Sequence, residues 1–247
     1  MSTATRTEAL CIGWDVGGWN CDRNRDSRDA LVILDADRAV VGTPWRGNLR
    51  ASINAATTSR DWLRALFGLC RADFPDTARL TLAVDTPLGF SAAFARLVTG
   101  GGPVAEVGED SGFNPYLFRA TERFLFAHGI KPLSPVKDMI GSQATKGMHV
   151  LAKFAPQVLS CGVWSDGANL TVIEAYPSPC RRSARIERLL KRHVPALDQA
   201  DKRDALICAL VASLFSTERD CLAPPADDVP AGEGWIWVPV DALSVLI

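Results

Sequence analysis

Three apolar runs in this chain each carry an acid at or near their end, and this pattern constrains the fold more than any other feature. "LCIGWD" ends at Asp15, "RLTLAVD" ends at Asp85, and "VIEAYPSP" carries Glu174. Glycines or prolines follow each acid within a few residues and stop the run. Short continuous apolar runs are typical of strands buried on both faces of a sheet. If the three strands are parallel, their acids meet at the carboxyl edge, where open α/β sheets bind ligands.

The segments between these runs predict a mixture of strands and helices. Two β-branched runs, 31–34 and 39–41, are separated by "DADR", which predicts a hairpin. Residues 59–72 predict a helix that Ser59 or Asp61 caps. We expect further helices at 90–99, 114–129 (with Pro115 in its first turn and Gly129 after its end), 138–155, 183–193 and 198–219. We expect further strands at 158–164, 169–175 and within "EGWIWVPV", and a glycine-rich loop at 99–112.

The order of these elements predicts one α/β domain over residues 1–247. It runs β-β-β-α-β, then a helical insertion over about 90–155, then β-β-α-α. The sequence contains no internal repeat and no low-complexity linker that would divide it.

Composition narrows the class of protein. The 247 residues are 47% hydrophobic, which is enough for a full core, and the net charge of −1 gives no attraction to long nucleic acid or to membranes. The sequence has no apolar run of 18 residues and no apolar region of a secretory signal at its start. Seven cysteines without a C-x-x-C pair indicate buried thiols in a reducing, cytoplasmic setting, and the three histidines lack zinc-ligand spacing.

A fourth acid lies on the predicted helix near the C-terminus. Positions 201, 204, 208, 211 and 215 share one helical stripe, so Asp204 lies on a line that ends in apolar residues. A carboxylate facing a core is costly unless it is paired or holds a metal. Asp201, one turn earlier, is either a further metal ligand or a first-turn acid that favours the helix dipole.

Asp15, Asp85, Glu174 and Asp204 together predict a catalytic metal site. Each acid also has a local explanation: Asp15 could bind the glycine amides, Asp85 could cap the next helix, and Glu174 could pair with an arginine of "CRRSAR". Clustered carboxylates raise one another's pKa, and hard divalent ions such as Mg²⁺ or Mn²⁺ remove that cost. Two such ions about 3.5–4 Å apart assist in-line displacement at phosphorus.

Four segments give the chain a resemblance to a known family. "IGWDVGGW", "AVDTPLGF", "IEAYPSP" and "DKRDALICALVAS", followed by "EGWIWVP", occur in the order found in the predicted RNase H-like nucleases of domain of unknown function 429. The resemblance covers roughly residues 9 to 240. It implies a ribonuclease H-like fold and a metal-binding acidic site at Asp15, Asp85, Glu174 and Asp204. The chain departs from the pattern in its longer helical insertion, so the resemblance implies less about the substrate.

Basic residues near these acids are candidate substrate ligands. Arg181 and Arg182 open a basic stretch over 181–203, which either positions phosphates or forms a solvated helix face. Arg119 and Arg123 are one helical turn apart and form either a phosphate fork or ion pairs with nearby acids. Lys146 is a further candidate of the same kind.

These observations favour a metal-dependent nuclease or phosphodiesterase that acts on nucleic acid or nucleotides and does not contact a membrane. One alternative is an ATP-dependent phosphotransferase of the actin and sugar-kinase class, because "GWDVGG" also resembles the first phosphate-binding turn of those enzymes. A second is a catalytically silent module that keeps the fold. The sequence leaves the type of nucleic acid, and the choice between monomer and homodimer, open.

Overall fold

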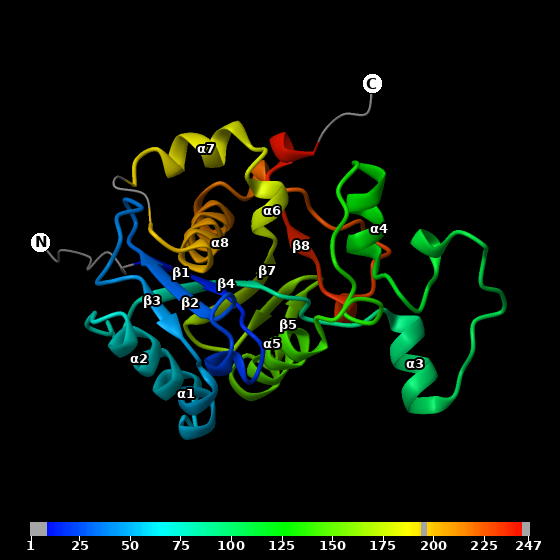
Figure 1. Cartoon of the computed structure of the whole chain (residues 1–247), viewed down its shortest axis with the longest axis horizontal. Helices are drawn as coiled ribbons and strands as arrows, with labels where there is room; N and C mark the ends of the chain where they lie inside the picture. Colours follow the sequence, from blue (N-terminus) through cyan, green and yellow to red (C-terminus); the bar gives the residue numbers. More distant parts are fainter. Residues whose placement is uncertain (1–8, 194–196, 244–247) are drawn as a thin grey trace, which may run out of the picture.

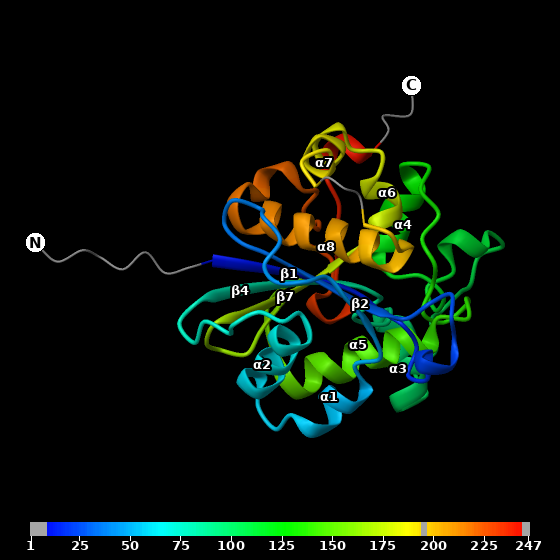
Figure 2. The same cartoon turned by 60° about the vertical axis from the view of Figure 1, so that its left-hand side comes forward.

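One mixed sheet separates two layers of helices in the computed structural model, which describes residues 9–193 and 197–243. Helices α7 and α8 cover one face, and helices α1, α2 and α5 cover the other (Figures 1 and 2). The predicted α/β class is confirmed at this level. Among the described residues, no helix has the length and apolar character needed to cross a bilayer.

The sheet has eight strands, and four of the seven pairings between them are antiparallel. They are β1 (Ala9–Asp15), β2 (Asp29–Leu34), β3 (Trp45–Gly47), β4 (Arg79–Asp85), β5 (Gln157–Ser160), β6 (Val163–Ser165), β7 (Leu170–Ala175) and β8 (Ile236–Trp237). The order is β3-β2-β1-β4-β7-β6-β5, and β8 pairs with β7. The three strands that carry acids, β1, β4 and β7, are parallel neighbours at the centre. Their carboxyl ends therefore share one edge.

The helices are α1 (Arg50–Ala55), α2 (Ser59–Leu69), α3 (Ala92–Gly100), α4 (Ala120–Ala127), α5 (Gly141–Phe154), α6 (Pro177–Cys180), α7 (Ala184–Leu190) and α8 (Ala200–Thr217). The described residues also form five short 3₁₀ turns: Cys21–Arg23, Ser111–Phe113, Arg219–Cys221, Ala231–Glu233 and Val240–Ala242.

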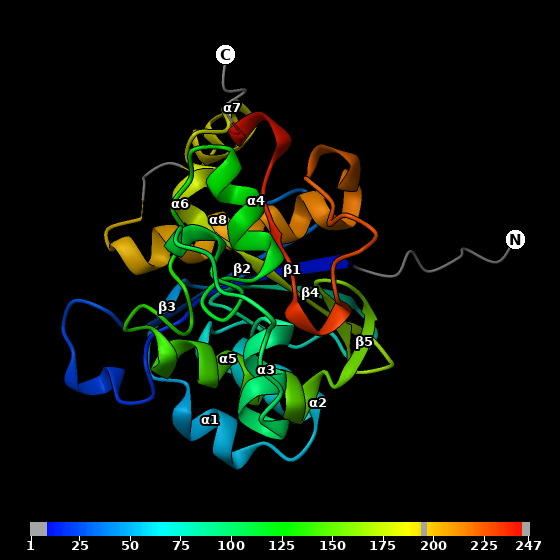
Figure 3. The ribbon, with the colours of Figure 1, turned by 90° about the vertical axis from the view of Figure 1, so that its right-hand side faces the viewer.

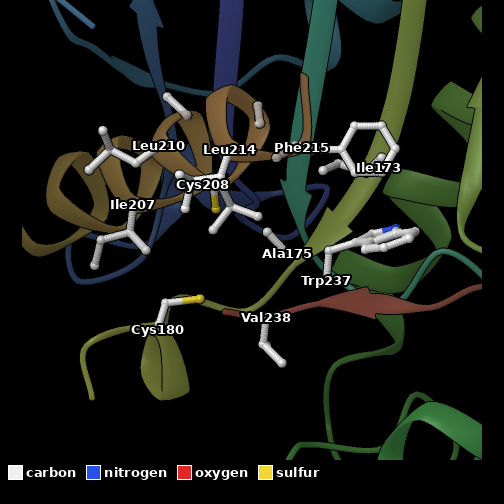
Figure 4. Packing of buried hydrophobic residues seen from close by; sticks show 14 of the residues in the cluster. Ile173, Ala175, Cys180, Ile207, Cys208, Leu210, Leu214, Phe215, Trp237 and Val238 are labelled. Carbon is white, nitrogen blue, oxygen red and sulfur yellow. The ribbon is translucent and has the colours of Figure 1, made fainter. Parts of the chain in front are cut away.

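Helix α8 lies directly on the sheet because the strand beneath it has a glycine. A side-chain carbon at Gly13 would come 1.9 Å from the carbonyl oxygen of Ala205, so only glycine allows this approach. From Ala205 to Phe215 every residue of the helix is buried. Figure 4 shows its apolar side chains facing Ile173 and Ala175 of β7, with Trp237 beside them. This close packing places Asp204 above the edge where the strands end.

The opposite face has its own aromatic core. Trp14 of β1 packs edge-on against Trp62 of α2, and Trp62 stacks on Phe154 of α5 with ring centroids 5.0 Å apart. Helix α5, at the end of the expected insertion, is thus part of the core. The earlier part of that segment, α3 and the chain after it, extends outward at the right of Figure 1.

Several predicted boundaries differ from the structure where turns interrupt a run. The hairpin after β2 forms, with Leu34 bridged to Val40, but its named return strand is β3, beyond the turn at Gly42. Residues 158–164 form a hairpin of β5 and β6, because Gly162 adopts the left-handed conformation between them.

The helices show similar differences at their ends. Helix α2 begins after Thr58, which forms a capping box with Asp61 instead of Ser59 or Asp61 capping alone. Helix α4 begins at Ala120, five residues after Pro115, because the Glu122 side chain binds the Arg119 amide and sets the start there. Its end before left-handed Gly129 is as predicted. The short helices α1 and α6 were not predicted.

Candidate active site

The carboxylates of Asp15 and Asp85 lie side by side at the ends of β1 and β4. The two residues are register partners in a parallel pair, and neighbouring strands are about 4.8 Å apart. Side chains alternate along a strand, so Asp15 projects on the same face as Gly13, which α8 covers. Asp85 shares that face with Ala83, which packs in the same cluster as α8. The structure therefore brings these two predicted acids together.

Neither acid forms an ion pair or a side-chain hydrogen bond in the described part of the chain. Burial raises the pKa of Asp15 to about 9, and the neighbouring charges of Asp85 and Asp204 add to this effect. Burial likewise raises the pKa of Asp85 well above its usual range; repulsion from Asp204 and Glu174 adds to this rise, and the charge of Arg181 opposes it. No hydrogen bond among these residues offsets the cost. A bound cation would favour the ionised forms.

Asp204 adds a third negative charge from the helix above. It is half-buried on α8 and forms an ion pair with Arg181, the residue that follows α6. Burial raises the pKa of Asp204, and the charge of Arg181 opposes that rise. Arg181 thus lies at the site as predicted, although it binds an acid there, while the exposed Arg182 has no ion pair among the described residues.

Asp201 is occupied by other contacts. Its Oδ2 accepts from Nε of Arg46 at 2.7 Å and from the backbone amide of Arg28 at 3.0 Å. These bonds fix the first turn of α8 against the loop before β2. Asp201 therefore acts as an anchor of the helix that carries Asp204, and its charge reaches Asp15 only over a distance.

Glu174 is at the same edge but is fully engaged. It pairs in register with Val84, so alternation directs it away from the Asp15–Asp85 face. Its Oε2 accepts from the amide of Leu88 at 3.0 Å and from Arg119 at 2.8 Å, while Oε1 accepts from Arg119 at 2.7 Å. The expected arginine partner from the "CRRSAR" segment is replaced by one from the inserted helix.

Arg119 and Arg123 do not form a fork. Arg119 is completely buried between Glu122 and Glu174 and also donates to the carbonyl of Glu233 at 3.0 Å. Arg123 is half-buried and lines a separate groove. The reason is that Arg119 precedes α4 as its cap residue, so the two side chains leave the backbone in different directions. Arg119 supports the position of Glu174, and Arg123 remains available.

Lys146 is also buried, where it clamps the glycine turn after Asp15. Its ammonium group forms an ion pair with Asp29 and donates to the carbonyls of Gly17 at 3.2 Å and Gly18 at 3.4 Å. Asp29 in turn accepts from the Gly17 amide at 2.9 Å and from the Trp14 indole at 3.0 Å. This network fixes the turn and with it the end of β1.

A cavity of about 230 Å³ opens at this edge. Asp15, Asp85 and Glu174 line it, together with Thr86, Gln143 and Tyr176. The hydroxyl of Thr86 is buried without a hydrogen-bond partner among the described residues. An unpaired buried hydroxyl beside two unpaired carboxylates indicates that the cavity is built for a polar occupant.

The donor chemistry fits a hard divalent cation. Asp15 and Asp85 offer carboxylate oxygens, which Mg²⁺ and Mn²⁺ prefer. Within residues 9–193 and 197–243, no three Asp, Glu, His or Cys side chains converge closely enough to hold one ion as they stand. Asp204, whose charge acts on both acids, is a candidate third ligand, and binding would require it to turn from Arg181.

Two residues that matter here were not predicted from the sequence. Asp29 is the first residue of β2, and in the sequence it resembles an ordinary turn acid. In the structure its carboxylate accepts hydrogen bonds from five donors. Glu233 accepts from the amides of Ala92 at 2.8 Å and Ala120 at 2.9 Å, so it joins the starts of α3 and α4. Ala92 and Ala120 lie more than 100 residues before Glu233 in the sequence, so no local pattern predicts these contacts.

The chain matches no protein-family model, no curated protein and no solved structure.

Proposed function

We propose that this protein is a metal-dependent phosphodiester hydrolase, a nuclease or phosphodiesterase that uses Mg²⁺ or Mn²⁺. The observation that carries the proposal is the side-by-side pair of Asp15 and Asp85, neither of which forms an ion pair or a side-chain hydrogen bond with any described residue. A protein that needed these carboxylates only for stability would be expected to pair them, as it pairs Glu174 and Asp29.

The arrangement of the elements supports the RNase H-like interpretation. An acid-ending strand, an antiparallel strand pair, a helix, a second acid-ending strand and a late helix with Asp204 follow in the order that the resemblance implies. The contact of α8 with β1, β2 and β4 keeps Asp204 over the strand ends.

The reaction that we propose is attack of water on a phosphodiester. The water oxygen forms a bond to phosphorus, the opposite P–O ester bond breaks, and the leaving oxygen gains a proton. Bound metal ions would supply an activated water and neutralise the leaving oxygen. Asp15 and Asp85 would hold these ions, Asp204 would join them, and Arg181, released from Asp204, would bind a phosphate oxygen.

The contacts of the glycine turn weigh against the phosphotransferase alternative. A phosphate cradle needs free backbone amides. Here the Gly17 amide donates to Asp29 and the Trp19 amide donates to the Ser142 hydroxyl at 2.9 Å, while Lys146 holds the carbonyls. Glycine is required at position 17 by space, because a side-chain carbon there would lie 2.7 Å from the Asp29 amide.

Metal binding is tested by thermal unfolding. We expect Mg²⁺ or Mn²⁺ to raise the melting temperature relative to EDTA, by an amount equivalent to about 2.7 kcal/mol at a hundredfold excess over Kd. Asp85→Asn should abolish the rise. Asp76→Asn is the matched control, because Asp76 is exposed and pairs with Arg60 and Arg64. An equal rise in both variants would contradict the site.

Catalysis is tested on a panel of single-stranded and duplex DNA, RNA, hybrids and small nucleotides. We expect metal-dependent cleavage of at least one substrate. Asp15→Asn and Asp85→Asn should each lower its rate by about 100-fold or more, since even residues behind metal ligands contribute about 10- to 100-fold. Metal binding without cleavage of any substrate would favour the silent binding module.

A further inference from the structure

A second hollow, larger than the acidic cavity, lies beside helix α4. We call it the aromatic groove: a cavity of about 730 Å³ between the 3₁₀ turn Ser111–Phe113, helix α4 and the chain after it. Helix α4 and its neighbouring segments face the viewer in Figure 3. The lining of the aromatic groove includes Phe113, Phe118, Phe126, Arg123, Lys131 and Lys137.

The aromatic groove adjoins the acidic cavity. Pro132 and Leu133 line both hollows, so they form the wall between them. Leu133 is half-exposed on this wall, and nearby Met139 is fully exposed. An extended chain that lay in the groove could therefore reach the cavity of Asp15 and Asp85 by crossing Pro132 and Leu133.

The cations of the groove are available. Arg123, Lys131 and Lys137 form no ion pair within the described residues. The two acids of the lining are engaged with the backbone: Asp110 accepts from the Gly112 amide and Asp138 from the Ser134 amide, each at 2.8 Å. The three cations outnumber the two acids of the lining, and this excess of positive charge favours an anionic occupant.

The aromatic residues add a second kind of contact. Phe113 is 69% exposed at the rim of the groove, which is unusual for so large an apolar side chain. Phe118 and Phe126 pack edge-to-face in the groove at 4.9 Å, and the Lys137 ammonium lies 5.7 Å from the Phe118 ring centre. Of these rings, Phe113 is the exposed one, and an exposed ring near free cations is the combination that binds unpaired bases and their phosphates.

We infer that the aromatic groove binds a single-stranded nucleic-acid segment that leads to the acidic cavity. Phe113 stacks on a base, and Arg123 and Lys137 contact flanking phosphates. The inference rests on the proposed function and specifies its substrate as single-stranded, because paired bases do not present their faces to a side chain.

Binding is measured apart from cleavage. The full-length protein is titrated in EDTA against a fluorescent twelve-nucleotide oligothymidine, with fluorescence anisotropy as the readout. A duplex of equal length and an oligoglutamate peptide are the competitors. We expect the single strand to bind most tightly and the peptide to compete poorly.

Variants separate the two kinds of contact. Phe113→Ala should weaken binding about fivefold or more, the lower range for one stacked base. Arg123→Ala and Lys137→Ala should each reduce the slope of log affinity against log salt by about 0.7, the value for one phosphate contact on a single strand. Leu159→Ala and Arg60→Ala are the controls, since both residues are exposed and lie outside the groove. Unchanged melting temperatures would show that the variants fold.

The outcomes distinguish this inference from the proposed function. If the protein cleaves a substrate but Phe113→Ala and Arg123→Ala bind it like wild type, the groove inference fails and the hydrolase stands. If the groove variants weaken binding while no metal-dependent cleavage occurs, the groove stands and the hydrolase fails. Equal binding of duplex or of oligoglutamate would overturn the inference.

Discussion

Two groups of buried acids at the same edge of the sheet are treated in opposite ways. Glu174 and Glu122 share the buried guanidinium of Arg119, which bonds to both. Asp85, one strand away from Glu174, and Asp15, two strands away, have no such partner among the described residues, and the pKa of each is raised. The chain thus neutralises some of its buried carboxylates and leaves others uncompensated.

This difference in charge compensation distinguishes acids that hold the fold together from acids of the candidate site. A buried acid with its full set of donors holds segments together: Glu174 and Arg119 connect β7 to the start of α4, and Asp29 and Lys146 connect β2 to α5. An acid that stays unpaired in a cavity costs stability and is retained for what it binds. The predictions below test this division, beginning with the partnered group.

Removing the shared arginine should have the largest effect. Arg119→Met leaves Glu122 and Glu174 buried and uncompensated, so we expect the free energy of unfolding to fall by about 3–5 kcal/mol. Urea denaturation measures this change. Arg123→Met is the matched control: Arg123 lies one turn after Arg119, within α4, but is half-buried and free of ion pairs in the described chain, so this variant should fall within about 0.5 kcal/mol of wild type. Similar losses in both variants would contradict a scaffold role specific to Arg119.

The stability of the metal-free protein should fall as pH rises, because the pKa values of Asp15 and Asp85 are raised in the folded state. Folding raises the pKa of Asp15 from about 4 to about 9, so the folded state binds its proton more tightly than the unfolded state. Metal-free protein should therefore lose stability as pH rises from 5 to 8, by at most about 1.4 kcal/mol per pH unit for each such carboxyl. Urea denaturation in EDTA across this range measures the slope, which Asp15→Asn should reduce. An unchanged slope in Asp15→Asn would show that folding does not raise the pKa of Asp15.

Neutralising one unpartnered acid should give the smallest effect and the opposite sign to Arg119→Met. At pH 7 in EDTA, folding requires Asp15 to take up a proton, because burial raises its pKa to about 9. Asp15→Asn removes that requirement, and we expect a gain of about 1 kcal/mol. The same variant should lose the stabilisation by Mn²⁺. Asp76→Asn, which removes an exposed, arginine-paired acid, should give no gain. A loss of stability in Asp15→Asn without metal would mean that this acid has a partner in solution.

The sequence predicted the strands with acids better than the partners of those acids. Apolar runs that end at Asp15 and Asp85 predicted the central strands, because continuous burial and turn residues are local signals. The pairing of Glu174 with Arg119 joins residues 55 positions apart. No local pattern distinguishes that arginine from Arg123, one turn later. Of the two alternatives that the sequence left open, a phosphate fork or ion pairs with nearby acids, the structure shows the ion pairs for Arg119.

Strand direction, by contrast, was partly predictable. Helices between acid-bearing runs favour parallel strands, and β1, β4 and β7 are parallel. Whether an acid at such an end faces α8 depends on register and alternation. A shift of one residue separates Asp85, which faces the helix, from Glu174, whose register partner is Val84.

The sequence by itself determined that buried strands would end in acids and that a late helix would carry Asp204 on an otherwise apolar stripe, since both follow from local periodicity. Only the tertiary structure decided which acids are paired. Arg119, Lys146 and Arg46 come from distant segments and neutralise Glu174, Asp29 and Asp201, respectively. Charge compensation acts through space, so Asp15 and Asp85 are distinguished from the other acids by the partners that the fold brings to each.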